Sequence, residues 1–170
     1  MENKIESERK FLIKFPDLSV LEKQPGCAVR KIEQTYLLCD TGSLRVRKTK
    51  ENGKIFYHIN EKRKTLTFSH EEYEKEISEE TYLELLRCRD TSRQTIFKTR
   101  YVIPYKKHTL EIDIYPFWTD RAILEIELQN ESEQYSIPPY ITVIREVTGD
   151  KRYSNKALAQ HLFTENIDIK

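Results

Sequence analysis

The sequence is poor in cysteine and glycine, and its cysteines show no metal or disulfide pattern. Cys27, Cys39 and Cys88 are odd in number, lie far apart and contain no CxxC pair, which argues against both a disulfide framework and a zinc site. The four histidines are equally scattered and form no HExxH motif. We therefore expect reduced thiols and no zinc cofactor.

Long apolar segments and an excess of one charge are also missing. No opening segment resembles a signal peptide, and no run of about 18 apolar residues would span a membrane. The 29 Lys and Arg balance the 28 Asp and Glu to a net charge of +1, which gives no global case for binding nucleic acid or an anionic membrane. These absences predict a cytoplasmic protein without nucleic-acid or membrane partners, in which any charge-based function is local.

What the sequence does contain is enough apolar material for a core. The chain has 170 residues, with ten Tyr, seven Phe and regularly placed Ile and Leu. This length suits one domain of ordinary size, and the aromatic content argues against disorder. We expect a single folded domain over residues 1–170.

Apolar and charged residues alternate along eight segments, as in half-buried β-strands. The expected strands are 5–14, 31–38, 43–48, 54–62, 71–77, 93–103, 108–115 and 121–129. Short helices are expected at 17–23, at 79–89 with Ser78 as N-cap, and at 154–163 with Ser154 as N-cap.

The charged faces of these strands segregate by sign. They carry Glu72, Glu74 and Glu76; Arg45 and Arg47; Lys98 and Arg100; Glu111 and Asp113; and Glu125 and Glu127. For any single strand, a polar face in water is the ordinary explanation. Like charges two residues apart repel unless an opposite charge lies in front of them. Carboxylates suit Mg²⁺ or Mn²⁺, whereas Arg and Lys suit phosphate oxygens, so together they indicate a metal and polyphosphate site.

Eight antiparallel strands can close into a barrel that holds one small ligand. We therefore predict an α+β fold around an eight-stranded antiparallel closed β-barrel, a tunnel with a charged lumen whose apolar outer faces are covered by helices. Water, metal and substrate must fill such a lumen, because desolvating this many unpaired ions would cost more than the stability of a whole domain.

Several short motifs follow one another in a recognisable order. ExExK at 6–10 precedes IEQTYL at 32–37, RVR at 45–47, KTRY at 98–101, EID at 111–113, EIE at 125–127 and REVTGDKRYSN at 145–155. This ordered set spans nearly the whole chain and resembles the CYTH superfamily, also called the triphosphate tunnel metalloenzymes. Its members hydrolyse or cyclise triphosphates with the help of a divalent metal. The resemblance implies the eight-stranded tunnel, with the C-terminal helix as a plug at one mouth.

The resemblance also implies roles for individual residues. The implied metal ligands are Glu6, Glu8, Asp113, Glu125 and Glu127. The implied phosphate-binding residues are Lys10, Arg45, Arg47, Lys98 and Arg100, with Lys156 of the plug helix as an addition. Lys10 and Tyr36 would lie near the attacked phosphorus. Glu74 is a further candidate for a metal contact. An equal alternative is that it only balances the positive charges of neighbouring residues on the inner face.

This sequence departs from the family pattern on the fourth strand. Many relatives carry TxK there, whereas this chain has His58, Ile59 and Asn60. A phosphate-binding lysine is therefore missing. Lys62 has the same strand parity and is expected to reach inward from the tunnel mouth.

The first functional interpretation is a tripolyphosphatase that takes a small-molecule triphosphate as substrate and Mg²⁺ or Mn²⁺ as cofactor. Metal and arginine charges would neutralise the substrate and its transition state, and no nucleophilic side chain is required. A class IV adenylate cyclase is one alternative. A non-catalytic polyphosphate- or nucleotide-binding protein is the other, favoured by Asn60 alone. Whether the protein forms a homodimer is left open by the sequence.

Overall fold

The computed structural model describes residues 7–64, 70–130 and 132–167; Glu6 and the side chain of Glu72 lie outside the described residues. The strands are β1 (Ser7–Lys14), β2 (Ala28–Leu37), β3 (Ser43–Glu51), β4 (Lys54–Lys64), β5 (His70–Ile77), β6 (Ile96–Tyr105), β7 (His108–Ile114), β8 (Arg121–Leu128) and β9 (Val143–Glu146). The helices are α1 (Leu18–Glu22), α2 (Glu79–Leu85) and α3 (Asn155–Gln160), with 3₁₀ turns at Leu86–Cys88 and Lys151–Tyr153.

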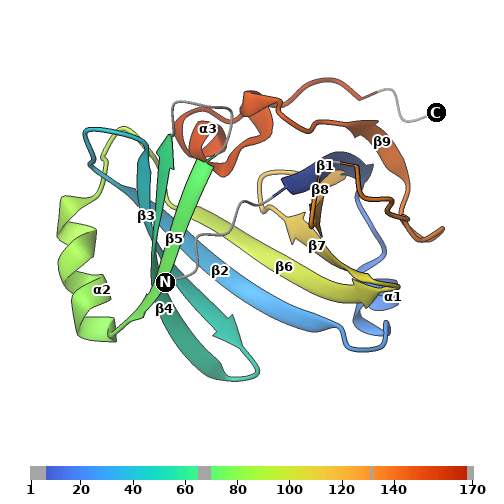
Figure 1. Ribbon diagram of the computed structural model, residues 1–170, viewed down its shortest axis with the longest axis horizontal. Coiled ribbons are helices and arrows are strands. Elements are labelled where there is room, and N and C mark those ends of the chain that lie inside the picture. The colour runs from blue at the N-terminus through green and yellow to red at the C-terminus, as the bar shows by residue number, and fades with distance from the viewer. Residues whose placement is uncertain (1–6, 65–69, 131, 168–170) are drawn as a thin grey trace.

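The strands form one curled antiparallel sheet in the order β5-β4-β3-β2-β6-β7-β8-β1-β9 (Figure 1). All eight predicted strands are present, but the prediction of eight strands closed into a barrel was wrong on both counts. The sheet has a ninth strand, β9, and it is not closed. The protein is mostly antiparallel β-sheet with a few short helices.

The ninth strand occupies part of the edge at which the sheet would have to close. Closure would require β5 to pair with β1, and a strand has only two edges for backbone hydrogen bonds. One edge of β1 pairs with β8 along its whole length. The other edge pairs with β9, from Phe11 opposite Glu146 to Ile13 opposite Val143. β9 therefore occupies the part of this edge from Phe11 to Ile13, and within the described residues β5 pairs with β4 alone.

The outer face of the sheet carries the main apolar core. Ile13, Ile103, Ile112 and Leu124 are fully buried there, and α1 covers them with Leu21. A smaller cluster around Val46 and Leu37 is covered by Tyr82 of α2. The predicted N-cap of α2 is confirmed, because the Ser78 side chain accepts a hydrogen bond from the backbone amide of Thr81.

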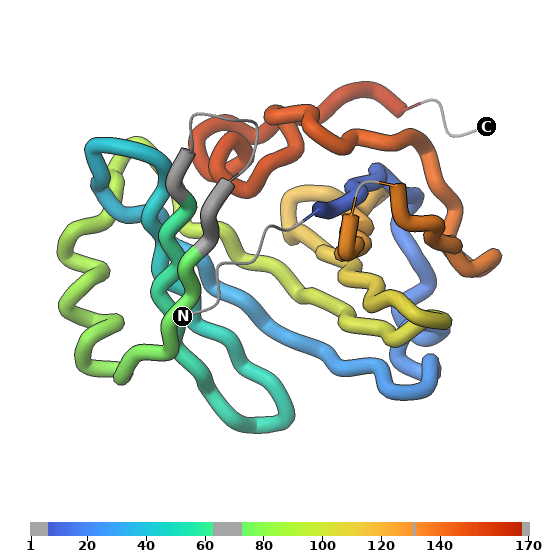
Figure 2. The backbone as a smooth tube through the Cα atoms, viewed as in Figure 1, coloured from blue at the N-terminus to red at the C-terminus, as the bar shows by residue number. Residues whose placement is uncertain are grey.

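The inner face is defined by the residues that point to the other side of the same strands, among them Lys10, Tyr36, Arg45, Lys98 and Asp113. The C-terminal part of the chain crosses this face (Figure 2). Leu158 and Ala159 of α3 pack with Leu12, Tyr36 and Ile123 in one buried cluster. The apolar end of the inner face is thereby covered, and its charged end forms the candidate site.

The predicted C-terminal helix begins where expected and ends early. Ser154 caps it by accepting a hydrogen bond from the amide of Ala157. The helix stops at Gln160 instead of 163, because His161 has an extended backbone conformation. Phe163 then packs against the same cluster as the helix. Among the described helices, none has the length and apolar character needed to cross a membrane.

Candidate functional site

Five carboxylates meet on neighbouring strands at the charged end of the inner face. This carboxylate cluster consists of Glu8 on β1, Glu111 and Asp113 on β7, and Glu125 and Glu127 on β8. The strand register sets Glu8 opposite Glu127 and Glu111 opposite Glu125. Directly opposed like charges destabilise a sheet unless a cation lies between them.

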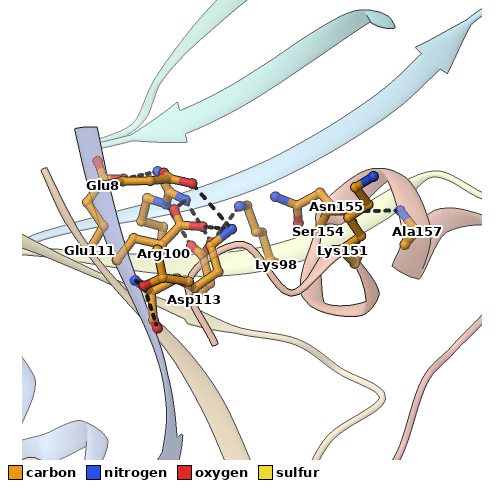
Figure 3. Close-up of polar contacts among 12 residues, drawn as sticks. Glu8, Lys98, Arg100, Glu111, Asp113, Lys151, Ser154, Asn155 and Ala157 are labelled. Carbon is orange, nitrogen blue, oxygen red and sulfur yellow. Dashed lines mark hydrogen bonds and ion pairs between the residues drawn. The ribbon is translucent and has the colours of Figure 1, made fainter. Parts of the chain in front are cut away.

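Asp113 is the buried centre of this group. Its side chain is fully buried, and it accepts hydrogen bonds from Lys98 Nζ at 2.6 Å and from Arg100 Nε at 2.6 Å. Although burial favours the neutral acid, Arg100 and Lys98 hold the pKa of Asp113 below its ordinary value. Figure 3 shows Arg100 and Asp113 together, with Lys98 between Asp113 and the start of α3.

Arg100 and Lys10 also pair with three other acids of the cluster, Glu8, Glu111 and Glu125. Arg100 Nη2 donates to Glu125 Oε2 at 2.8 Å, and Arg100 Nη1 pairs with Glu111. Lys10 Nζ lies 2.9 Å from Glu125 and 3.7 Å from Glu8. Burial and the neighbouring charge of Arg100 lower the pKa of Lys98 to about 8, whereas Glu125 and Glu8 outweigh burial and raise the pKa of Lys10.

The chemistry of the carboxylate cluster fits a divalent metal ion. Lys10, Lys98 and Arg100 pair with four of these acids, Glu8, Glu111, Asp113 and Glu125, and carboxylate oxygens are the ligands that Mg²⁺ and Mn²⁺ prefer. Burial and then Glu125 raise the pKa of Glu111, as expected where acids crowd together. In the described part of the chain no three acidic, His or Cys side chains are arranged to hold a metal ion. The carboxylate oxygens are instead occupied by ion pairs with Arg100 and Lys10.

Arg45 and Arg47 of β3 supply a second cationic element on the inner face. Both have a buried Nε atom without a hydrogen-bond partner. Burial, then the charges of Arg45 and Arg100, lower the pKa of Arg47 to about 10. A buried donor without a partner is costly. The two arginines are therefore arranged for an anion.

Gln34 and Tyr36 of β2 lie between the arginines and the carboxylate cluster. The register places Gln34 opposite Arg47 and Tyr36 opposite Arg45. Gln34 Nε2 donates to the Tyr36 hydroxyl at 3.0 Å, and Gln34 Oε1 accepts from Arg47 Nη2 at 3.5 Å. Because the Tyr36 oxygen accepts this hydrogen bond, its own hydrogen is available for a ligand.

Glu74, a predicted metal ligand, lies at the far end of the inner face. Its neighbours are not the other predicted metal ligands. Asn60 donates a hydrogen bond to Glu74, and Arg47 Nη1 lies 3.7 Å from the same carboxylate. Lys62, opposite Ser43 at the end of β4, shares the face of Asn60. The structure thus places Glu74 with cations and donors rather than with the other acids.

Lys156 is the predicted phosphate-binding residue that the structure directs elsewhere. Its Nζ donates to the carbonyl of Gly42 at 2.8 Å, which ties α3 to the turn between β2 and β3. A cavity of about 120 Å³ beside this contact is lined by Tyr36, Gly42, Arg93 and Lys156 among others. Arg93 strengthens the same attachment by donating to the carbonyl of Lys156 at 2.8 Å.

Two inner-face residues were not assigned a role from the sequence. Glu111 joins the carboxylate cluster through Arg100, and its alternation with Asp113 was a sufficient signal. Gln34 is completely buried and links Arg47 to Tyr36. It shares a strand face with Tyr36, but an uncharged side chain offers no charge pattern that would mark it.

Comparison with known proteins places this geometry in a family. The chain is 32% identical to an inorganic triphosphatase of Nitrosomonas europaea over 157 residues, which cover 91% of this chain and 96% of the relative. It is 31% identical to an inorganic triphosphatase of Acetivibrio thermocellus over 160 residues, or 92% of this chain and 94% of the relative.

Similarity extends to solved structures. The crystal structure of the inorganic triphosphatase NE1496 matches with a TM-score of 0.55 and 28% identity over 98% of this chain and 100% of that chain. The PH1819 protein of Pyrococcus horikoshii, at 20% identity over 72% of this chain and 80% of that chain, shares the fold with a TM-score of 0.53. The CYTH domain model matches residues 4–162. With its sheet, its carboxylate cluster and this match over most of its length, the chain belongs to the CYTH domain family.

Proposed function

We propose that this protein is a metal-dependent triphosphatase that hydrolyses inorganic tripolyphosphate on the inner face of its sheet. The observation that carries the proposal is the pair Arg45 and Arg47, whose buried Nε atoms lack partners beside the carboxylate cluster. Family membership and the two relatives named inorganic triphosphatase support the same activity.

Substrate binding follows from the cations of the inner face. Arg45 and Arg47 present donors that need an anion, and an arginine side chain donates to phosphate oxygens in bidentate fashion. Lys98 and Arg100 lie on β6, next to β2, and extend the positive charge toward the acids. A chain of three phosphates has enough negative charge to relieve the mutual repulsion of these cations.

Glu8, Asp113, Glu125 and Glu127 would hold the divalent ion, Mg²⁺ or Mn²⁺, with Glu111 added to this set and Glu6 as a ligand outside the described residues. When bound, the ion supplies Lewis-acid polarisation of phosphate oxygens. Lys10 and Arg100, which pair with these acids in the structure, would be the nearest cations for the phosphate oxygens of the substrate.

Lys10 and Tyr36 are the residues proposed to act at the attacked phosphorus. The Lys10 ammonium remains charged at neutral pH, because its pKa is raised by Glu125 and Glu8. It neutralises charge on the phosphoryl group during a loose transition state. The Tyr36 hydroxyl, oriented by Gln34, can donate its hydrogen to a phosphate oxygen or to the attacking water.

A substrate panel tests the proposal. Phosphate release is measured from tripolyphosphate, ATP and thiamine triphosphate, each with Mg²⁺ and with Mn²⁺, and the ATP reaction is assayed for cyclic AMP. We expect metal-dependent release with preference for tripolyphosphate. Cyclic AMP with pyrophosphate would establish a cyclase instead, and binding without turnover would establish a binding protein.

A further inference from the structure

Three side-chain nitrogens from two strands lie near the carboxylate of Glu74. Asn60 Nδ2 donates to Glu74 Oε2, and Arg47 Nη1 lies 3.7 Å from the same oxygen. His58 Nε2 lies 4.0 Å from Glu74 Oε1. Arg47 belongs to β3 and the other two donors to β4, whereas Glu74 reaches them from the edge strand β5. One carboxylate thus occupies the centre of a site built from donors.

The carboxylate is held much less firmly than the donors around it. The Glu74 side chain is 49% exposed, whereas that of Arg47 is 18% exposed and Asn60 is buried. Exposed ion pairs contribute little net stability. A ligand with more negative charge than one carboxylate can therefore displace Glu74 without moving the donors.

The donors also keep unused hydrogen-bonding capacity. Arg47 Nε is buried and has no hydrogen-bond partner, and the same holds for Nε of Arg45, which is opposite Asn60 in the register. The single carboxylate of Glu74 therefore does not satisfy this site. A phosphate group, with three oxygens and a larger charge, matches it better.

We propose that Glu74 is a built-in stand-in for a phosphate group of the substrate. In the free protein its carboxylate lies beside Arg47, Asn60 and His58, and a terminal phosphate takes that position when the substrate binds. Asn60 and His58 are then substrate-binding residues that perform the task of the lysine missing from this strand. The inference rests on the proposed function in so far as the ligand is a triphosphate.

The test measures the Kd of tripolyphosphate by titration calorimetry in metal-free buffer, with the full chain. The variants are Glu74→Gln, Asn60→Ala and the combination of both, with Glu84→Gln on the exposed surface of α2 as a control of equal charge change. Removing the competing carboxylate should tighten binding about threefold or more, the range expected for loss of an exposed ion pair. The control should stay within about twofold of the wild type.

The combined variant tests whether Asn60 acts through Glu74. In the wild type, Asn60→Ala removes a substrate contact but also loosens the competing carboxylate, so the two effects offset each other. In the Glu74→Gln background only the lost contact remains, and Asn60→Ala should weaken binding by a larger factor there. Equal factors in both backgrounds would overturn the proposal.

Two further outcomes also decide the matter. Weaker or unchanged binding in Glu74→Gln and in Glu74→Ala would overturn the stand-in role, and a higher Mg²⁺ requirement for turnover would make Glu74 a metal ligand. Tripolyphosphate turnover by the wild type is recorded in parallel. Binding that follows the predicted pattern without turnover would contradict the triphosphatase function and leave the inference intact.

Discussion

Lys10 and Glu125 face each other in register across β1 and β8, and the Lys10 ammonium nitrogen lies 2.9 Å from a carboxylate oxygen of Glu125. The pair joins a proposed phosphate-binding residue to a proposed metal ligand. A second buried ion pair joins Lys98 on β6 to Asp113 on β7 at 2.6 Å, although the register sets Arg100 opposite Asp113. The free protein thus pairs these buried charges with one another, and under the proposed function substrate and metal ion would compete for the same side chains.

Loss of the central carboxylate should destabilise the fold. Asp113→Asn leaves Lys98 and Arg100 buried without their main counter-ion, which costs about 3 kcal/mol or more of unfolding free energy. Urea denaturation measures this change. Glu146→Gln, which breaks the exposed pair with Arg9, is the control and should cost about 1 kcal/mol or less. Equal losses in both variants would contradict the central role of Asp113.

Arg47 should be a residue that function requires and stability does not. Burial and the charge of Arg45 lower its pKa to about 10, which means that folding disfavours its charged form. Arg47→Met should therefore leave the free energy of unfolding unchanged or raise it by up to about 1 kcal/mol, while lowering kcat/KM for tripolyphosphate about 100-fold. Denaturation without phosphate or metal measures the first effect, and steady-state kinetics the second.

A matched substitution separates this effect from simple loss of charge. Arg30 lies on the same face and forms an ion pair with Glu51 at 2.9 Å. Arg30→Met should lower stability slightly, by up to about 1 kcal/mol, because it removes a favourable pair. A larger stability loss in Arg47→Met than in Arg30→Met would show that the contacts of Arg47 with Gln34 and Glu74 outweigh the cost of burying its charge.

Lys156 should matter for attachment of α3 more than for phosphate binding. Its ammonium donates to the carbonyl of Gly42, so Lys156→Met should lower the melting temperature and reduce kcat/KM for tripolyphosphate by less than about tenfold. Arg45→Ala is the comparison, with an expected loss of about 100-fold. If Lys156→Met reduced kcat/KM as much as Arg45→Ala, Lys156 would have to be a phosphate-binding residue.

The segment after α3 should detach in acid. The Tyr153 hydroxyl donates to Glu165, and Arg145 Nη2 lies 2.7 Å from the same carboxylate; Tyr153 and then Arg145 lower the pKa of Glu165 despite burial. A depressed folded-state pKa stabilises the protein above the unfolded value of about 4.3, and this contribution is lost as the pH falls through the folded value. Wild type should therefore exceed Glu165→Gln in stability at neutral pH, and the difference should shrink as the pH falls below about 4.3 and vanish below the lowered folded-state pKa. A difference that persists in acid would rule out Glu165 as its source.

Strand alternation predicted the inner face well because side-chain direction is a local property. Lys98 and Arg100 point inward while Tyr101 and Ile103 enter the outer core, as a period of two requires. Closure of the sheet could not be predicted in this way, because it depends on which distant segment reaches the free edge of β1. The four-residue β9 reaches that edge, and its sequence, VIRE, is too short for a clear pattern.

The contacts of individual site residues could not be predicted from the sequence either. Glu74 shares its strand face with Glu76, yet its contact with Asn60 follows from the register between β4 and β5. Lys156 fits a phosphate-binding role by type, but the packing of α3 brings it to a backbone carbonyl. Family resemblance identifies residue types and their order, whereas register and helix docking decide what each side chain contacts.

The central claim is that cations and acids on one face act together on a triphosphate. The most direct measurement is metal-dependent phosphate release from tripolyphosphate by the wild type, Arg45→Ala and Glu125→Ala, with folding of each checked by thermal denaturation. We predict turnover in the wild type and its loss in both folded variants, because one loses the phosphate contact and the other the metal ligand. Rates like those of the wild type in both variants would contradict the assignment of this face as the active site.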